Sequence, residues 1–263
     1  MTVQTFQKGA GKNKLTYPLD AKQIRDLQKC KIVSPRVGKH HGIVMPAALC
    51  NDASRKEALA EVMAVREQVK AGEFPRAFME KYYPDDWGTF PKEIPALLAR
   101  EGLSFDDPEG LADVVHMDNP VDLGAAMLGW VLGKINDNQW DSFPFLDLVP
   151  GAMAGMARDV HSALVKAFDV KYYYGIARPE EVGDGPGMTH YDEGSPAHPS
   201  FPAGHGAAAF ASAVYFLREV PTLSDADKKA LFDAAYIWAM ARTFAGVHYA
   251  VDNLTFAPRR AEV

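Results

Sequence analysis

Cysteines and long apolar runs are scarce in this sequence. Cys30 and Cys50 are the only two thiols among 263 residues, too few for a disulfide framework. No stretch of about eighteen or more uncharged apolar residues occurs, so we expect no membrane span. The first residues, MTVQTFQKGAGKNK, lack the apolar core of a secretory leader. These absences favour a cytoplasmic protein.

Excess positive charge is also missing. The chain has 28 Lys and Arg residues against 34 Asp and Glu residues, a formal net charge of −6. A protein whose main partner is nucleic acid usually presents a basic surface, so we expect no nucleic-acid partner. With 48% hydrophobic and 24% charged residues, the composition is that of an ordinary globular protein.

Alternation of apolar and polar residues, which is typical of strands, rarely extends beyond four residues, and no internal repeat is visible. Apolar residues instead recur at helical spacing, which predicts helices over 51–74, 121–137, 149–169, 204–220 and 224–244. Residues 1–50 lack this spacing and are predicted to form an extended arm or strap. The segment 74–95 is rich in turn residues and aromatics, so we expect short helical turns at best. The fold class predicted for 1–263 is a single all-α domain, a helical bundle.

The stretch HPSFPAGHGAAAFASA, residues 198–213, places two histidines around a proline–glycine turn at the start of a predicted helix. Helix N-termini carry unpaired N–H groups and partial positive charge, so they bind anions readily. His205 at that point is a candidate to hold an anion or to give it a proton. The alternative is that Pro202 and Gly204 punctuate a loop and His205 caps the helix.

The stretch KYYYGIARP contains two basic residues, Lys171 and Arg178, seven positions apart. On a continuous helix they would lie within about 20° of one another. Pro179 disfavours helix at Arg178, so the helix is predicted to end or distort there. The alternative is that both are solvated head groups on buried stems.

The stretch ARTFAGVHYAVDN places His248 and Asp252 four residues apart, as neighbours on one predicted helical face. A carboxylate in that position fixes the imidazole tautomer and raises the basicity of the other ring nitrogen. Arg242 would lie about 120° from His248 on an unbroken helix. A shared site therefore needs a break, which Gly246 is placed to give. The alternative is a surface histidine–aspartate pair.

Together these stretches supply three cations, the two histidines His205 and His248, a carboxylate and a glycine turn. A tetrahedral oxyanion such as phosphate or vanadate needs this set of donors, because each charge-assisted hydrogen bond contributes roughly 1.5–3 kcal/mol. The three motifs, K-x6-RP, PAGH and AR-x5-H-x3-D, resemble the signature of the type 2 phosphatidic acid phosphatase and vanadium-dependent haloperoxidase superfamily over residues 171–252.

This resemblance implies a helical bundle and a role for each site residue. The resemblance implies that Lys171, Arg178, Arg242 and the backbone N–H of Gly204 bind the oxyanion. It also implies that His205 is the acid–base residue and that His248 is the nucleophile or the ligand of the metal. Asp252 would then orient His248. The sequence has Ala203 and Ala241 where the superfamily usually has serine. Loss of the first hydroxyl is expected to weaken vanadate binding by about 1 kcal/mol.

The wider loop, EGSPAHPSFPAGH, and the stretch GVHYAVDN resemble the bromoperoxidase branch. In that branch a histidine at the position of His198 is associated with bromide activity. The resemblance implies vanadate as cofactor, bound by His248, with Lys171 polarising hydrogen peroxide. Bromide would be the halide, with iodide or chloride as alternatives, and a small organic molecule the acceptor. The alternatives are an acid phosphatase that uses a phospho-histidine intermediate and a non-catalytic oxyanion-binding protein.

Two further expectations concern assembly and the remaining histidines. The superfamily normally continues into a further helix beyond the position of Asp252. We therefore expect a homo-oligomer in which a partner subunit completes the bundle; the alternative is a shortened form of the fold. The adjacent pair His40 and His41 lacks the spacing that shares a helical face and is interpreted as part of a loop. Isolated histidines elsewhere are given structural roles: His116, His161 and His190.

Overall fold

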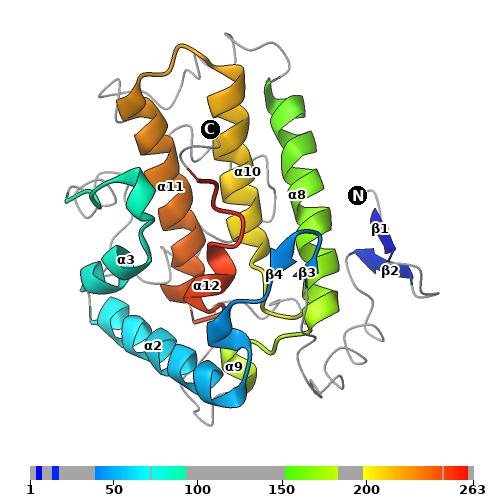
Figure 1. The fold of residues 1–263 in the computed structure, drawn as a ribbon, viewed down its shortest axis with the longest axis vertical. Helices are drawn as coiled ribbons and strands as arrows, with labels where there is room; N and C mark the ends of the chain where they lie inside the picture. The colour runs from blue at the N-terminus through cyan, green and yellow to red at the C-terminus, as the bar shows by residue number, and fades with distance from the viewer. Residues whose placement is uncertain are drawn as a thin grey trace.

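The structure is a computed structural model that describes residues 4–7, 14–17, 39–71, 73–92, 152–182, 198–244 and 246–259. The described part is mostly helical, which confirms the all-α fold class (Figure 1). The predicted helix 121–137 lies outside the described residues, as do His116 and His190. Within the described residues, no helix is long and apolar enough to cross a membrane.

Three long helices stand side by side, with α10 in the middle (Figure 1). Their bounds are Ala152–Tyr174 for α8, Gly204–Glu219 for α10 and Asp225–Phe244 for α11. Every position of α11 from Ala230 to Phe244 is buried. A helix that is covered on all sides lies inside its domain, and α11 is accordingly the centre of the hydrophobic core.

Local signals in the sequence explain where these helices begin and end. The predicted capping box opens α11: the Ser224 N–H donates to the Asp227 carboxylate at 3.1 Å, and the Asp227 N–H donates to the Ser224 hydroxyl at 3.2 Å. A similar reciprocal pair, Asn51 and Ser54, opens α2. After α8 the chain turns at Gly175, whose φ of +64° is readily adopted by glycine.

The segment between α2 and the gap at 93 forms short helices, as predicted. After α2 (Asp52–Lys70), this segment contains α3 (Arg76–Tyr82) and the 3-10 helix η2 (Asp85–Trp87). Their aromatic side chains pack on α11, with ring centroids 5.2 Å apart for Tyr83 and Tyr236 and 4.7 Å apart for Trp87 and Phe232. This turn-rich segment therefore supplies part of the core.

The described part of the first fifty residues contains two short antiparallel hairpins and one 3-10 turn. The bounds are Gln4–Gln7 for β1, Lys14–Tyr17 for β2, Lys39–His40 for β3, Ile43–Val44 for β4 and Ala47–Leu49 for η1. The Tyr174 hydroxyl donates to the carbonyl of Ile43 at 2.8 Å. This bond fixes the β3–β4 hairpin to the C-terminal end of α8.

Two very short helices complete the described fold, α9 (Pro179–Val182) and α12 (Ala250–Asn253). The first turn of α10 lies close against α12: a Cβ atom added at Gly206 would meet the Asn253 carbonyl oxygen at 2.3 Å. Only a glycine permits this approach. The contact brings the PAGH turn next to the segment that carries Asp252.

Candidate active site

Six charged or titratable side chains from the three motifs gather between these elements, and we call them the inner cluster. Each is at most 8% exposed. The members are Lys171, Arg178, His198, Arg242, His248 and Asp252. Charged side chains are rarely buried unless they are paired or bind a ligand. A cluster of this kind inside a small domain is therefore a candidate functional site.

Lys171 lies in the last turn of α8 and is fully buried. Its ammonium group donates to the carbonyl oxygens of Pro199 and Ser200 at 2.8 and 2.7 Å. An ammonium group has three N–H donors, so among the described residues one remains for a ligand. Lys171 thus ties the loop ahead of α10 to α8 and still offers a donor.

Arg178 reaches the cluster from the loop after α8 and not from a helical face. The helix ends at Tyr174, so the predicted break before Pro179 is confirmed. Its Nε donates to the His198 carbonyl at 3.0 Å, and its Nη1 donates to the Val247 carbonyl at 3.1 Å. The guanidinium group therefore connects the two loops that carry His198 and His248, which excludes the alternative of a solvated head group.

His198 is held in a defined protonation state by its neighbours. The Arg178 Nη2 lies 3.1 Å from His198 Nδ1, and the Pro199 carbonyl oxygen lies 3.2 Å from the same nitrogen. Burial lowers the pKa of His198 well below its usual value, and the charges of Lys171 and Arg178 lower it further. His198 is accordingly neutral. The ring of Phe168 packs edge-on against it at 5.0 Å.

His248 and Asp252 are in contact, although not on one helical face as the sequence predicted. His248 precedes α12, which begins only at Ala250, because Tyr249 is an extended N-cap residue. His248 Nδ1 nevertheless lies 3.1 Å from Asp252 Oδ2. A carboxylate only accepts, so Nδ1 carries the proton and the lone pair is on Nε2. The alternative of a surface pair is wrong, since both side chains are buried.

Ser200 belongs to the same network, and the sequence analysis did not identify it. Its hydroxyl donates to Asp252 Oδ2 and lies 3.2 Å from His248 Nδ1. The available signal was a lone hydroxyl residue between two motif histidines in an otherwise apolar turn. The family resemblance gives no hint of Ser200, because the superfamily usually has its serine at the position of Ala203.

The carboxylate of Asp252 is strongly desolvated. Burial raises its pKa to about 6, while the Ser200 hydroxyl, the Lys171 charge and the Tyr249 N–H oppose the shift. The Tyr249 N–H donates to Oδ2 at 3.0 Å, whereas Oδ1 is buried and accepts no hydrogen bond from any described residue. At neutral pH Asp252 is therefore ionised, and it loses its charge in mildly acidic solution.

The electrostatics of the inner cluster favour an anion. Burial lowers the pKa of Lys171 well below its usual value; the charges of Arg178 and Arg242 add to this, and that of Asp252 opposes it. Burial likewise lowers the pKa of His248, with contributions from the same three cations. Because such effects require proximity, the three cations and His248 share one site. Within the inner cluster, only Asp252 supplies negative charge.

Arg242 lies in the last turn of α11, just before the predicted break in the chain. The helix ends at Phe244, and Gly246 has a φ of +79°. The Val247 N–H then donates to the Arg242 carbonyl at 3.2 Å. The chain thereby reverses within a few residues, which returns His248 to the neighbourhood of Arg242.

Gly204 and His205 occupy the first two positions of α10. The N-cap residue is Ala203, so the alternative in which His205 caps the helix is wrong. The Ala203 N–H donates to the Asp252 carbonyl at 2.9 Å. His205 is partly buried, and its charge is among the causes that lower the pKa of His198. The helix start and its histidine therefore lie beside the inner cluster.

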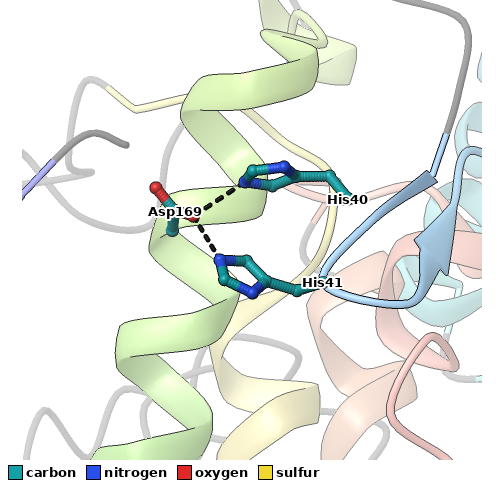
Figure 2. A group of neighbouring side chains, drawn as sticks. All are labelled: His40, His41 and Asp169. Atoms are coloured by element: carbon teal, nitrogen blue, oxygen red, sulfur yellow. Dashed lines mark hydrogen bonds and ion pairs between the residues drawn. The ribbon is translucent and has the colours of Figure 1, made fainter. Parts of the chain in front are cut away.

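A second group of side chains, which we call the outer cluster, consists of His40, His41 and Asp169. Asp169 Oδ2 lies 2.7 Å from His40 Nε2 and 2.5 Å from His41 Nε2 (Figure 2). The sequence analysis set the two histidines aside because adjacent residues do not share a helical face. That reason does not apply here, because the pair lies at a hairpin and the third member comes from α8. His161, by contrast, is exposed on α8.

The comparison with protein families bears on the inner cluster directly. A family model of the PAP2 superfamily matches residues 150–255. A PAP2 superfamily domain is thus detected in this part of the chain. All six members of the inner cluster lie inside the PAP2 domain, whereas His40 and His41 lie outside it. The match is to the superfamily and not to one of its branches. No curated protein and no solved structure gave a significant match.

Proposed function

We propose that this PAP2 domain is a vanadate-dependent haloperoxidase that oxidises bromide with hydrogen peroxide to hypobromous acid. PAP2 superfamily members are generally enzymes, and the buried site has the groups that this chemistry needs. The observation that carries the proposal is the combination of three buried cations with a neutral His248 whose Nε2 lone pair is fixed by Asp252.

The donor set fits a tetrahedral oxyanion that also accepts a nitrogen ligand. Arg178 and Arg242 offer guanidinium N–H groups, which match the oxygens of such an anion. Lys171 has an N–H directed to no described acceptor, and the start of α10 adds the backbone N–H of Gly204. His248 Nε2 supplies the ligand. Vanadate, when bound, would supply a Lewis-acidic centre at which hydrogen peroxide is activated toward the halide.

The protein's own residues then have distinct tasks. Lys171 would place a positive charge beside the oxygens of hydrogen peroxide and so favour attack by bromide on one of them. His205, partly buried at the helix start, would take a proton from hydrogen peroxide and return it as hypobromous acid leaves. The second peroxide oxygen would leave as water with one further proton from solvent, so that hydrogen peroxide, bromide and one proton give hypobromous acid and water. Asp252 keeps the His248 proton on Nδ1 throughout. We assign the halide contact to His198, which is neutral and buried against Arg178.

An acid phosphatase is the second candidate, and one observation favours it equally. A neutral His248 with a free Nε2 lone pair is also a nucleophile toward phosphorus. The nitrogen–phosphorus bond would form as the ester oxygen–phosphorus bond breaks, and His205 would protonate the departing alcohol. His205 would then take a proton from water, which attacks the phospho-histidine and releases phosphate.

The two candidates are separated by two assays on the metal-stripped protein. In the first, vanadate, hydrogen peroxide and bromide are added with a phenol dye, and bromination is followed by absorbance. In the second, an aryl phosphate is supplied without vanadate. Bromination that requires vanadate supports the proposal. Aryl phosphate hydrolysis that vanadate inhibits supports the phosphatase, and activity in neither assay leaves a non-catalytic oxyanion-binding protein.

His198→Ala tests the halide role within the same assays. We expect bromide oxidation to fall about tenfold, the effect of losing one hydrogen bond to a charged group, and aryl phosphate hydrolysis to change much less. Equal losses in the two assays would show that His198 only supports Arg178. His161→Ala, at an exposed position on α8, is the matched control.

A further inference from the structure

The outer cluster brings together three side chains that metal ions prefer as ligands. The two imidazole Nε2 atoms and the Asp169 carboxylate oxygen all lie within 4.8 Å of one another. Figure 2 shows both rings extending from the β3–β4 hairpin toward the same carboxylate on α8. The histidines are separated from Asp169 by 129 and 128 residues in sequence. Tertiary structure alone therefore creates this arrangement.

The backbone and the neighbouring rings hold the histidines in this arrangement. His41 has a φ of +50°, a conformation that few residues other than glycine adopt, and His40 immediately precedes it at the end of β3. The ring of Tyr173 stacks on His40, with centroids 4.1 Å apart and an interplanar angle of 1°. The two imidazole rings lie 4.5 Å apart. Their convergence on Asp169 is thus supported from two sides.

We propose that the outer cluster binds a divalent transition-metal cation, Zn²⁺ or one of similar ligand preference. Two imidazoles and one carboxylate form a ligand set that suits such cations, and water would occupy the remaining position. The His41 side chain is 48% exposed, so solvent reaches the cluster. Ligand atoms around tetrahedral Zn²⁺ lie about 3.3 Å apart, so each N···O separation has to open by less than about 1 Å.

The imidazole protons can be accommodated when the cation binds. Each imidazole in the outer cluster now donates from Nε2 to Asp169 Oδ2, because a carboxylate only accepts. When Nε2 binds the cation instead, the proton moves to Nδ1 of the same ring, and the carboxylate turns from acceptor to ligand. The cation thus replaces two hydrogen bonds by three coordinate bonds. No oxidant or further ligand from the chain is needed.

This site would join the N-terminal part of the chain to the PAP2 domain. His40 and His41 precede the matched residues 150–255, whereas Asp169 lies within them. Asp169 is only two residues from Lys171, so the cation would fasten the hairpin to the turn of α8 that also serves the inner cluster. The proposal does not depend on which reaction the inner cluster performs.

The test measures Zn²⁺ binding to the full chain, after treatment with a chelator and without vanadate, by titration calorimetry. We expect about one equivalent of Zn²⁺ to bind to the wild type. His41→Asn and Asp169→Asn should each weaken this binding by at least about tenfold. Asparagine tolerates the positive φ at position 41 and preserves the shape at position 169, so both variants should fold. Circular dichroism checks this.

Two controls make the result decisive. His161→Ala removes an exposed histidine from α8 and should bind Zn²⁺ like the wild type. Co²⁺ in place of Zn²⁺ should give visible absorption that is lost in His41→Asn. No Zn²⁺ binding by the wild type, or equal binding by the wild type and both asparagine variants, would overturn the proposal.

Discussion

The inner and outer clusters lie on opposite sides of one helix and have opposite charge preferences. Lys171 faces the inner cluster and Asp169 the outer cluster; residues two apart on a helix point about 200° away from each other. The inner cluster is buried and has three cations against one carboxylate. The outer cluster is partly exposed and has no permanent cation. Helix α8 thus separates a site that fits an anion from a site that fits a cation.

The largest effect is expected from a substitution that disables the inner cluster and leaves the outer cluster intact. His248→Ala removes the nitrogen that acts as ligand or nucleophile, so kcat/KM should fall by at least about 10³-fold in whichever assay is active. Zn²⁺ binding at the outer cluster should be unchanged. His161→Ala, matched in residue type, should keep full turnover. Near wild-type activity in His248→Ala would show that the inner cluster is not the active site.

A smaller loss of anion affinity is expected on one side of α8 only. Lys171→Met removes a buried cation, and the dissociation constant for inorganic phosphate or vanadate should rise about ten- to hundredfold, as for loss of a charge-assisted hydrogen bond. Lys166→Met, at an exposed position of the same helix, should leave this constant unchanged. Equilibrium dialysis measures both. An equal effect of the two substitutions would contradict a localised anion site.

The third prediction concerns the close packing of α10 against α12, which supports the inner cluster. Gly206→Ala places a Cβ 2.3 Å from the Asn253 carbonyl oxygen and should lower the free energy of unfolding by about 1–3 kcal/mol. Gly204→Ala is the matched control, because its nearest neighbour, Leu164 Cδ2, would be at an ordinary 3.5 Å. Urea denaturation compares the two. A larger cost at Gly204 would contradict the described packing.

The smallest effect tests Ser200 as a positioning residue. Ser200→Ala should lower kcat by about tenfold with little change in KM, because the variant loses one hydrogen bond to a charged group. The Ser200 hydroxyl lowers the pKa of Asp252, so its removal raises that pKa. Activity that requires ionised Asp252 is lost as the pH falls through about 6, and in the variant it should be lost at a higher pH.

A serine elsewhere in the bundle separates positioning from mere packing. Ser212 is buried in α10, where its hydroxyl donates to the Ala208 carbonyl at 2.9 Å. Ser212→Ala should leave the pH profile in place. An unshifted profile in Ser200→Ala would show that its hydroxyl does not act on Asp252.

Local patterns predicted the helices and the inner cluster well. Apolar spacing and caps located α2, α8, α10 and α11, since these signals act over a few residues. The gathering of Lys171, Arg242 and His248 was predicted because glycine and proline breaks mark where a helix must end. The prediction that His248 lies on a helix was wrong, since an i,i+4 spacing does not reveal that the intervening Tyr249 is extended.

Contacts between distant segments were beyond such patterns. Nothing near His40 and His41 indicates that Asp169 will meet them, because that contact depends on how the hairpin docks on α8. Ser200 was missed for a related reason: its partners, His248 and Asp252, are 48 and 52 residues away. Spacing reveals residues that share an element, whereas packing decides which elements meet.

The bonds from Lys171 and Arg178 to backbone carbonyls have a consequence for how the protein responds to salt. These cations hold the two loops from beneath the surface, where dissolved ions screen charges far less than they do in solution. Raising the ionic strength should therefore neither loosen the loops nor much reduce the attraction for an oxyanion. We therefore expect the arrangement of the inner cluster to be the same in concentrated salt and in dilute buffer.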